Sequence, residues 1–264
     1  HLRFLDQGYV IFADENTELP VRDLCIALDC SSPSRFPKRE KLFYHAGKKT
    51  VCIDHHQNHN GFAKYNYVVP GASSTCELVY DILDPTGEID ANIANYLFMG
   101  LSTDTGHFMH SNTTPKVLYT AYKLAKYGAD VYRLSTLLYR SRTREKTELI
   151  AEAIRSMRFY ENGKVAFITM TREMLDRCHI DANETEGIID YAIAVKGVEI
   201  GISICEEKPN EFKVSFRSRG RRVDAIASVF GGGGHIFAAG CRVSGVKEDV
   251  VDKIMKAVRD TSEQ

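Results

Sequence analysis

The chain has 264 residues, of which 44% are hydrophobic and 26% are charged, and its formal net charge is -1. This composition is typical of a globular protein and excludes the disordered, collagen-like and small disulfide-rich classes. The near-zero net charge gives no overall attraction to nucleic acid, so any site for a polyanion must be local.

The apolar stretches and the cysteines bear on the compartment in which the protein works. No uncharged apolar stretch approaches the roughly 20 residues needed to cross a bilayer. The seven cysteines include no CxxC pair and have mostly apolar neighbours, which is typical of reduced core residues. We therefore expect a cytoplasmic protein that has no membrane partner.

Short apolar runs alternate with helical patterns in the first half of the chain, as in βαβ units. Residues 24–28 and 51–53 are predicted to be buried strands, and an aspartate ends each of them, Asp29 and Asp54. Because the carboxyl ends of parallel strands lie along one edge of a sheet, we expect both aspartates to face one cleft.

Three helices are predicted to follow these strands. The first spans residues 73–83, with Ser74 and Glu77 as a capping box. The second begins near residue 90 and breaks in the polar stretch 102–106, and the third spans 115–127. Residues 131–158 are charged, contain no Gly or Pro and have a helical period, so we interpret them as a connector between domains.

The pattern changes after residue 163 and predicts a second domain. Strands are expected at 164–170, 198–205 and 212–217, and a short helix at 223–230 runs into four glycines. The predicted fold class is therefore α/β. It comprises a parallel-sheet domain at 1–130, the helical connector at 131–158, and a smaller α/β domain at 159–264.

The DHH triplet at residues 54–56 is the most distinctive polar motif of the first half. Consecutive residues at a strand end point in different directions, so one imidazole can ligate a metal while the other faces a substrate. Carboxylate and imidazole ligands together suit Mn, Fe or Zn. The triplet alone is equally compatible with a structural role, but Asp29 and Asp104 add carboxylates at two further element ends. We interpret His107 and His110 as loop residues beside this site.

These motifs resemble those of the DHH phosphoesterase superfamily. The similarity rests on residues 28–36 (LDCSSPSRF), 54–56 with Asn58, 70–77 (PGASSTCE) and 100–106 (GLSTDTG). Asn58 and the GGGGH sequence at 231–235 resemble the branch of nanoRNases and pAp phosphatases. The resemblance covers nearly the whole chain.

The resemblance implies a dinuclear metal site and a role for each matching residue. Two Mn ions are expected, with Mg as an alternative, because a pair of cations can clamp a phosphate and activate water. Asp29 would bridge the two ions, and His55 and Asp104 would ligate one of them. His56 would act on the phosphate, and Asp54 would orient the imidazoles.

One motif of the family is missing from this sequence. A His-x-x-x-Asp-x-Asp segment on the first strand should precede Asp29 by several tens of residues, and no segment matches it. We expect that the chain lacks the start of its first domain. The alternative is a degenerate family member that binds nucleotides without hydrolysing them.

The second half contains a candidate phosphate site. The arginine at 217 ends a predicted strand and is suited to bidentate phosphate contacts, and the amides of a glycine run can approach a phosphate closely. Resemblance to the DHH-associated domain implies that a terminal nucleotide is held by Arg217, Ser218, Gly232, Gly233, Gly234 and His235. We interpret the basic cluster at 140–144 as a solvated helix face, with contact to an oligonucleotide as the alternative.

The resemblance implies a metal-dependent phosphoesterase. The expected substrates are very short RNA and linear dinucleotides such as pApA, which would be cleaved to mononucleotides, with pAp as a further substrate. It also implies a homodimer. The alternatives are a cyclic-dinucleotide phosphodiesterase and the degenerate nucleotide-binding protein.

Overall fold

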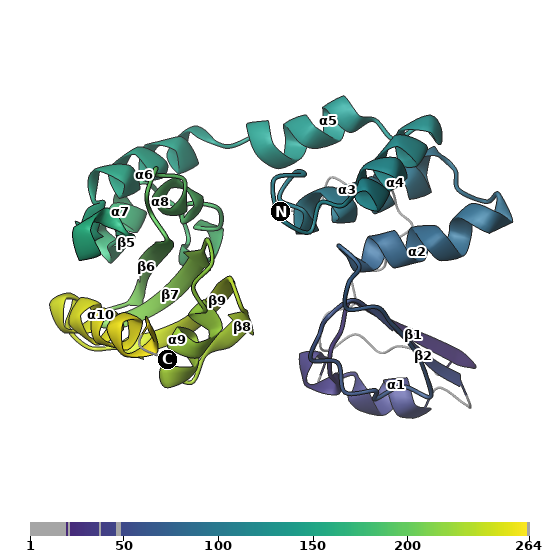
Figure 1. Ribbon diagram of the computed structural model, residues 1–264, viewed down its shortest axis with the longest axis horizontal. Helices are drawn as coiled ribbons and strands as arrows, with labels where there is room; N and C mark the ends of the chain where they lie inside the picture. Colours follow the sequence, from purple (N-terminus) through teal and green to yellow (C-terminus); the bar gives the residue numbers. More distant parts are fainter. Residues whose placement is uncertain (1–19, 21, 37, 46–48, 263–264) are drawn as a thin grey trace. The chain divides into compact units, whose positions relative to one another are not determined.

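The computed structural model describes residues 20, 22–36, 38–45 and 49–262 of the chain (Figure 1). The chain divides into two compact units, residues 1–141 and 142–264. The division falls inside the segment 131–158 that the sequence predicts as a connector. Both units combine helices with a β-sheet, so the predicted α/β class is confirmed. Within the described ranges, no helix combines the length and the apolar character needed to cross a bilayer.

The sheet of the first unit has three parallel strands in the order β1 (Leu24–Leu28), β2 (Lys49–Asp54) and β3 (Tyr65–Val68). The first two strands form where the apolar runs predict them, but the expected burial of β1 is wrong, because Leu24, Ile26 and Leu28 are exposed in the structure. The third is absent from the sequence prediction because its side chains are mostly exposed and it has no apolar run.

The two predicted aspartates lie at the same edge of this sheet. Asp29 follows β1 directly, and its backbone N–H donates to the carbonyl of Ile53 (3.0 Å). Asp54 is the last residue of β2. Both aspartates therefore lie at the carboxyl ends of neighbouring strands, as predicted, but the Asp54 side chain is buried and does not face a cleft.

Helices follow the strands of the first unit and contribute most of its apolar core, around Phe98, Leu101 and Leu124. Helices α2 and α3 approach closely at Gly100, where a Cβ atom would overlap the Sγ of Cys76. The helical segments of this unit are Pro33–Arg35 (3-10), α1 (Glu40–His45), α2 (Thr75–Leu83), Asp84–Thr86 (3-10), α3 (Ala91–Asp104), α4 (Pro115–Lys126), α5 (Val131–Ser135) and Thr136–Arg140 (a π-helix).

The second predicted helix, α3, ends at Asp104, inside the polar stretch 102–106 where the sequence predicts its break. The hydroxyl of Thr105 donates to the carbonyl of Leu101 (2.7 Å), so this polar side chain bonds to the preceding turn and does not interrupt the helix. The chain leaves the helix at Gly106, whose φ of +55° is left-handed. Asp104 is therefore the last residue of the helix, at the element end where the sequence places it.

The predicted helical connector is interrupted. After the π-helix, Ser141 adopts an extended conformation, and a new helix, α6 (Arg144–Arg155), begins with the side chain of Thr143 capping the N–H of Lys146. The break contains neither Gly nor Pro, so the only sequence signal for it is the capping threonine.

The second unit is built on a mixed sheet of six strands in the order β4-β5-β6-β7-β9-β8, in which only β5 and β6 are parallel. The strands are β4 (Arg158–Tyr160), β5 (Val165–Met170), β6 (Ile200–Lys208), β7 (Glu211–Ser218), β8 (Gly233–His235) and β9 (Ala238–Ser244). The helical segments after α6 are Glu161–Gly163 (3-10), α7 (Arg172–Arg177), Ala182–Glu184 (3-10), α8 (Asp190–Ile193), α9 (Val223–Val229) and α10 (Lys247–Ser262).

The two faces of this sheet are covered differently (Figure 1). Helices α9 and α10 pack on one face, over a core that includes Val214, Phe216 and Ile254. Helices α6, α7 and α8 pack on the other face, chiefly over β5 and β6. On that second face, the side chains that β7 presents are polar and half-buried, among them Ser215 and Arg217.

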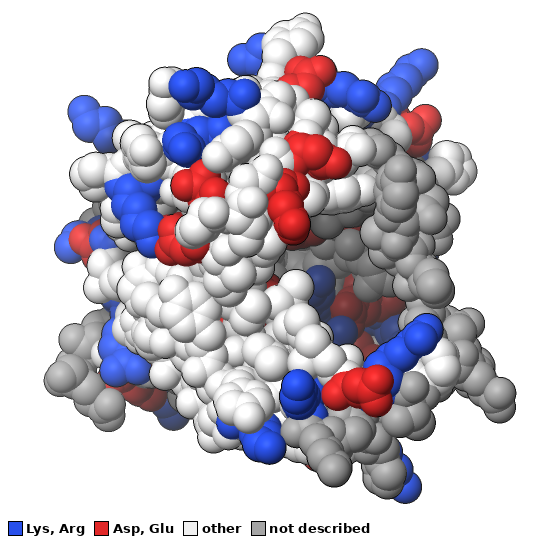
Figure 2. Space-filling model, turned by 90° about the vertical axis from the view of Figure 1, so that its right-hand side faces the viewer, with Lys and Arg blue, Asp and Glu red and all other residues white. Residues whose placement is uncertain are grey.

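The charged side chains are mixed on the surface. On the face drawn in Figure 2, basic and acidic groups alternate over the described residues, and neither sign forms one continuous field. This agrees with the net charge of -1 and directs the search for a polyanion site to local clusters.

Candidate metal centre and nucleotide site

Asp29 places a carboxylate directly after the carboxyl end of β1. Its φ of +59° lies in the left-handed region, which is uncommon for a residue other than glycine and typical of functional sites. The hydroxyl of Thr75 donates to its Oδ1 (2.8 Å), and the side chain is 55% exposed. The backbone and Thr75 thus hold this carboxylate in place while it faces outward.

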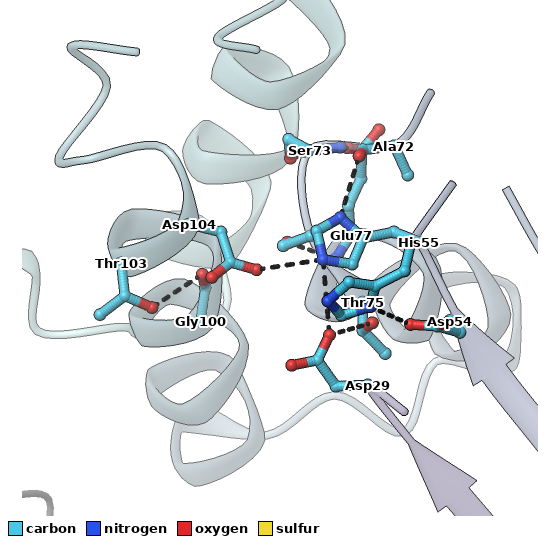
Figure 3. A network of polar contacts seen from close by, with 12 residues as sticks. Asp29, Asp54, His55, Ala72, Ser73, Thr75, Glu77, Gly100, Thr103 and Asp104 are labelled. Carbon is cyan, nitrogen blue, oxygen red and sulfur yellow. Dashed lines mark hydrogen bonds and ion pairs between the residues drawn. The ribbon is translucent and has the colours of Figure 1, made fainter. Parts of the chain in front are cut away.

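His55 is oriented by a backbone carbonyl. Its Nδ1 lies 3.3 Å from the carbonyl oxygen of Ala72. Because a carbonyl only accepts hydrogen bonds, Nδ1 carries the hydrogen, and the lone pair of the neutral ring is on Nε2. Nε2 lies 3.4 Å from Oδ1 of Asp29 and 3.8 Å from Oδ2 of Asp104 (Figure 3). A histidine whose second nitrogen donates to a carbonyl is a common form of metal ligand.

Asp104 completes a convergence of electron-rich atoms. Burial and the negative charge of Asp29 raise the pKa of its carboxyl to about 6, although His55 opposes the shift. The side chain is still 38% exposed, so a ligand can reach it. Two carboxylates and an imidazole lone pair that face one another are stabilised by a cation between them. These residues therefore fit a divalent metal ion.

Asp54 lies behind His56 and is completely buried. Its Oδ1 accepts a hydrogen bond from Nδ1 of His56 (2.7 Å). Burial would raise the pKa of the Asp54 carboxyl, but the hydrogen bonds and the charge of His56, with the backbone N–H groups that follow, lower it. Its Oδ2 finds no hydrogen-bond partner in the part of the chain that the structure describes. Asp54 thus orients the His56 ring through its Nδ1.

All five residues predicted for this site lie together in the first unit. Asp29, His55 and His56 each offer a ligand atom, and these atoms lie within 4.8 Å of one another. Asp104 joins them through its contact with His55. The assignment of His56 to the phosphate and not to the metal stays a prediction.

The turn before α2 supports the site. The Ser74 hydroxyl accepts a hydrogen bond from the N–H of Glu77 (3.1 Å), as the predicted capping box requires. The Glu77 carboxylate, however, accepts from the N–H and the hydroxyl of Ser73 (2.8 and 2.7 Å). Lys116 of α4 pairs with the same carboxylate (3.1 Å). Burial would raise the pKa of Glu77, but these partners hold it below its usual value. The network fixes the turn that carries the Ala72 carbonyl.

The loop after α3 is tied to the same turn. The side-chain amide of Asn112 donates to the carbonyls of Ser73 and Asp104 (3.1 Å each). His107 has its Nδ1 near the Ser102 hydroxyl (3.1 Å), and Nδ1 of His110 lies 3.4 Å from the backbone carbonyl of Asp104, not from its carboxylate.

The sequence analysis misses Thr75, Ala72 and Asn112 as supports of the site. Thr75 and Ala72 lie inside the motif at 70–77, but Ala72 acts through its backbone carbonyl, which no residue type signals. Asn112 acts from a loop that is distant in the sequence.

In the second unit, the strand pairing places Arg217 and His235 on one face of the sheet. Arg217 of β7 lies directly opposite Ala238 of β9, and Ala238 lies opposite His235 of β8. Directly opposed residues point to the same side, so a single small side chain separates the cation from the imidazole. Ser218 also shapes the turn after β7, because its Oγ accepts a hydrogen bond from the N–H of Arg221 (2.8 Å).

The glycine run forms an edge strand, not an open loop. A Cβ atom at Gly232 would overlap the Gly240 carbonyl and lie 2.8 Å from the Cα of Cys241, and one at Gly234 would lie 2.7 Å from the Cα of Ala239. These two glycines are needed for the close approach to β9. Gly233 has open space at its Cβ position, so its backbone remains accessible to a ligand.

Comparison with known proteins gives consistent matches for both units. The family model "DHH family, N-terminal domain" matches residues 2–101, and the DHHA1 domain model matches residues 162–264. The bifunctional oligoribonuclease and PAP phosphatase NrnA of Thermus thermophilus is 30% identical over 262 residues, which are 98% of this chain and 77% of that protein. The Bacillus subtilis protein of the same name is 26% identical over 236 residues, 88% of this chain and 73% of that protein.

A solved structure shows the same fold. An exopolyphosphatase-related protein from Bacteroides fragilis superposes with a TM-score of 0.84 at 23% sequence identity, and the match covers 90% of this chain and 71% of that one. The resemblance predicted from the motifs is confirmed. The chain belongs to the DHH family, and its second unit carries a DHHA1 domain.

Proposed function

We propose that this protein is a metal-dependent phosphoesterase that cleaves very short oligoribonucleotides and linear dinucleotides such as pApA to mononucleotides, and that it also dephosphorylates pAp. The observation that carries the proposal is the convergence of the Asp29 and Asp104 carboxylates on Nε2 of His55. The names of the Thermus thermophilus and Bacillus subtilis relatives, which combine oligoribonuclease with PAP phosphatase, support this choice of substrates.

The proposed metal is Mn, with Mg as the alternative. The site combines carboxylate oxygens with an imidazole nitrogen, and this mixture suits Mn better than Mg. Asp29, His55 and Asp104 would hold the metal, which would neutralise the charge of a bound phosphate and lower the pKa of a water molecule.

Other residues of the first unit orient the metal ligands and His56. Thr75 holds the Asp29 carboxylate, and the Ala72 carbonyl holds His55 with its lone pair outward. Asp54 holds the His56 ring through Nδ1, so that Nε2 can act on the phosphate.

The DHHA1 domain would bind the end of the substrate. Arg217 and His235 share one sheet face across Ala238, and an arginine offers paired donors to a phosphate. We assign Ser218, Gly232, Gly233 and Gly234 to the same site as residues that shape it. We further propose that the protein works as a homodimer in the cytoplasm, with the segment 131–158 connecting the two domains.

A comparison of substrates tests this function. Purified protein is incubated with pApA, pAp and cyclic di-AMP in the presence of Mn²⁺, and the products are separated by chromatography. We expect AMP from both linear substrates and little reaction with the cyclic one. Preferential cleavage of cyclic di-AMP would instead identify a cyclic-dinucleotide phosphodiesterase.

A further inference from the structure

The second unit contains a pocket of about 370 Å³ beside Arg217. This volume falls in the range of small-molecule sites, roughly 300–1,000 Å³. The pocket does not include the glycine strand. It extends in the other direction, over β6 and β7, and its walls include Thr185, Ser203, Lys213 and Ser215.

The strand β7 supplies a row of polar side chains to this pocket. Lys213, Ser215 and Arg217 alternate with the buried Val214 and Phe216, so the three polar residues share one face of the sheet. Ser203 of β6 lies opposite Ser215. The hydroxyls of these two serines make no side-chain hydrogen bond within the described segments, so both remain available to a ligand.

The two cations of the row form no close ion pair with a carboxylate in the described part of the chain, whereas neighbouring arginines do. Lys213 acts at longer range on the Glu207 carboxylate, whose pKa Arg242 lowers most and the Lys213 charge lowers further. The paired neighbours are Arg221 with Glu161, Arg222 with Asp224 and Arg242 with Glu207. Of the residues that line the pocket, one is acidic, Glu186. Two cations and one carboxylate leave the pocket positive.

The wall opposite β7 is held in position by α6. The amine of Lys146 contacts the backbone carbonyls of Glu184 and Glu186, the latter at 3.1 Å. The hydroxyl of Thr185 donates to the carbonyl of Ala182 (2.8 Å). These bonds give the segment a fixed shape before any ligand enters, which lowers the entropic cost of binding.

We propose that this pocket binds the terminal phosphate of the substrate, with Lys213 joining Arg217 as a second cation and the hydroxyls of Ser203 and Ser215 as donors. The inference rests on the proposed nucleotide site at Arg217. Four residues of an extended strand separate the Cα atoms of Lys213 and Arg217 by about 13 Å. Because both side chains are long, the two cations can reach one phosphate that lies between them in the pocket, and the phosphate that is cleaved is left to the metal residues. A terminal phosphate on the substrate would be recognised in this way.

Binding measurements test the proposal without catalysis. The affinities of the full chain for pApA and for ApA, which lacks the terminal phosphate, are measured by calorimetry in EDTA at fixed salt. We expect the unmodified protein to prefer pApA. Lys213→Met should weaken pApA binding about tenfold and leave ApA binding nearly unchanged. Lys208→Met is the matched control, because Lys208 lies at the end of β6, pairs with Glu211 (3.7 Å) and does not line the pocket.

Each other outcome overturns a defined part of the account. Equal affinity of the unmodified protein for pApA and ApA, or the same loss for both ligands in Lys213→Met, would show that the terminal phosphate does not bind in this pocket. An equal loss of pApA affinity in Lys208→Met would show that the loss in Lys213→Met comes from general surface charge and not from the pocket. Binding of neither ligand would overturn the proposed nucleotide site as well. Unchanged circular dichroism of both variants shows that any loss is not unfolding.

Discussion

The Nε2 atom of His55 lies 3.4 Å from Oδ1 of Asp29, and both atoms are hydrogen-bond acceptors when the ring is neutral. The carbonyl of Ala72 fixes the tautomer, and the hydroxyl of Thr75 fixes the carboxylate. The fold therefore holds two groups together that do not stabilise each other. A cation between them resolves this conflict, which is why we place the metal there.

Substitution of His56 separates turnover from binding. We expect His56→Ala to lower kcat for pApA about 100-fold with little change in KM, because a positioned acid contributes to the transition state. His179→Asn is the control, since His179 is exposed in the other unit and asparagine tolerates its left-handed backbone (φ +53°). Steady-state kinetics give both constants. A His56→Ala protein with the full rate would show that this role is wrong.

Substitution of Arg217 should weaken substrate binding and leave turnover nearly unchanged. Arg217→Gln removes a charged donor from the proposed nucleotide site, so we expect KM for pApA to rise about tenfold while kcat stays near its original value. Arg259→Gln, on the exposed side of α10, removes the same charge from the same unit and should change neither constant. A fall in kcat at unchanged KM would contradict a binding role for Arg217.

The glycines of β8 differ in what a side chain would meet. Gly232→Ala, just before the strand, would force a Cβ against the Gly240 carbonyl, so we expect it to destabilise the protein by about 2 kcal/mol. Gly233→Ala meets no atom within 4 Å and should change stability by at most about 0.5 kcal/mol. Urea unfolding followed by circular dichroism measures both. Similar losses in the two variants would argue against the close pairing of this strand with β9.

The buried Glu77 makes stability depend on pH. Because its pKa is lower in the folded protein than in the unfolded chain, its stabilisation is complete above the unfolded pKa of about 4.3 and is lost as the pH falls through the folded pKa. We expect Glu77→Gln to cost about 2 kcal/mol at pH 7. The difference from the unmodified protein should shrink below about pH 4.

Urea unfolding at several pH values measures the effect of Glu77→Gln. Glu88→Gln, at an exposed position of the same unit, is the control and should have little effect at any pH. A deficit of Glu77→Gln that grows as the pH falls would contradict the assigned direction of the pKa shift.

The sequence predicts the parts of the site that follow from strand ends. The apolar runs before Asp29 and Asp54 identify two neighbouring parallel strands, and this alone brings both carboxylates to one edge. The capping residues Ser74 and Glu77 likewise predict the start of α2. Such features depend on local patterns of residues, and the structure confirms them.

Features that depend on pairing between distant strands are not predictable in this way. The sequence suggests a glycine loop at 231–235, but β8 forms because Gly234 packs against β9. No sequence pattern singles out Lys213, because its importance comes from the pocket that it lines together with Ser203 of the neighbouring strand.

The most direct test of the central claim is the release of AMP from pApA with Mn²⁺ and with EDTA, by the unmodified protein and by Asp29→Asn. Binding of Mn²⁺ is measured on the same samples by calorimetry. We predict release that requires the metal, and at least a tenfold weaker metal affinity in the variant together with loss of release. Release that persists in EDTA would contradict the metal site. Nucleotide binding without any release would instead identify a protein that has kept the fold and lost the reaction.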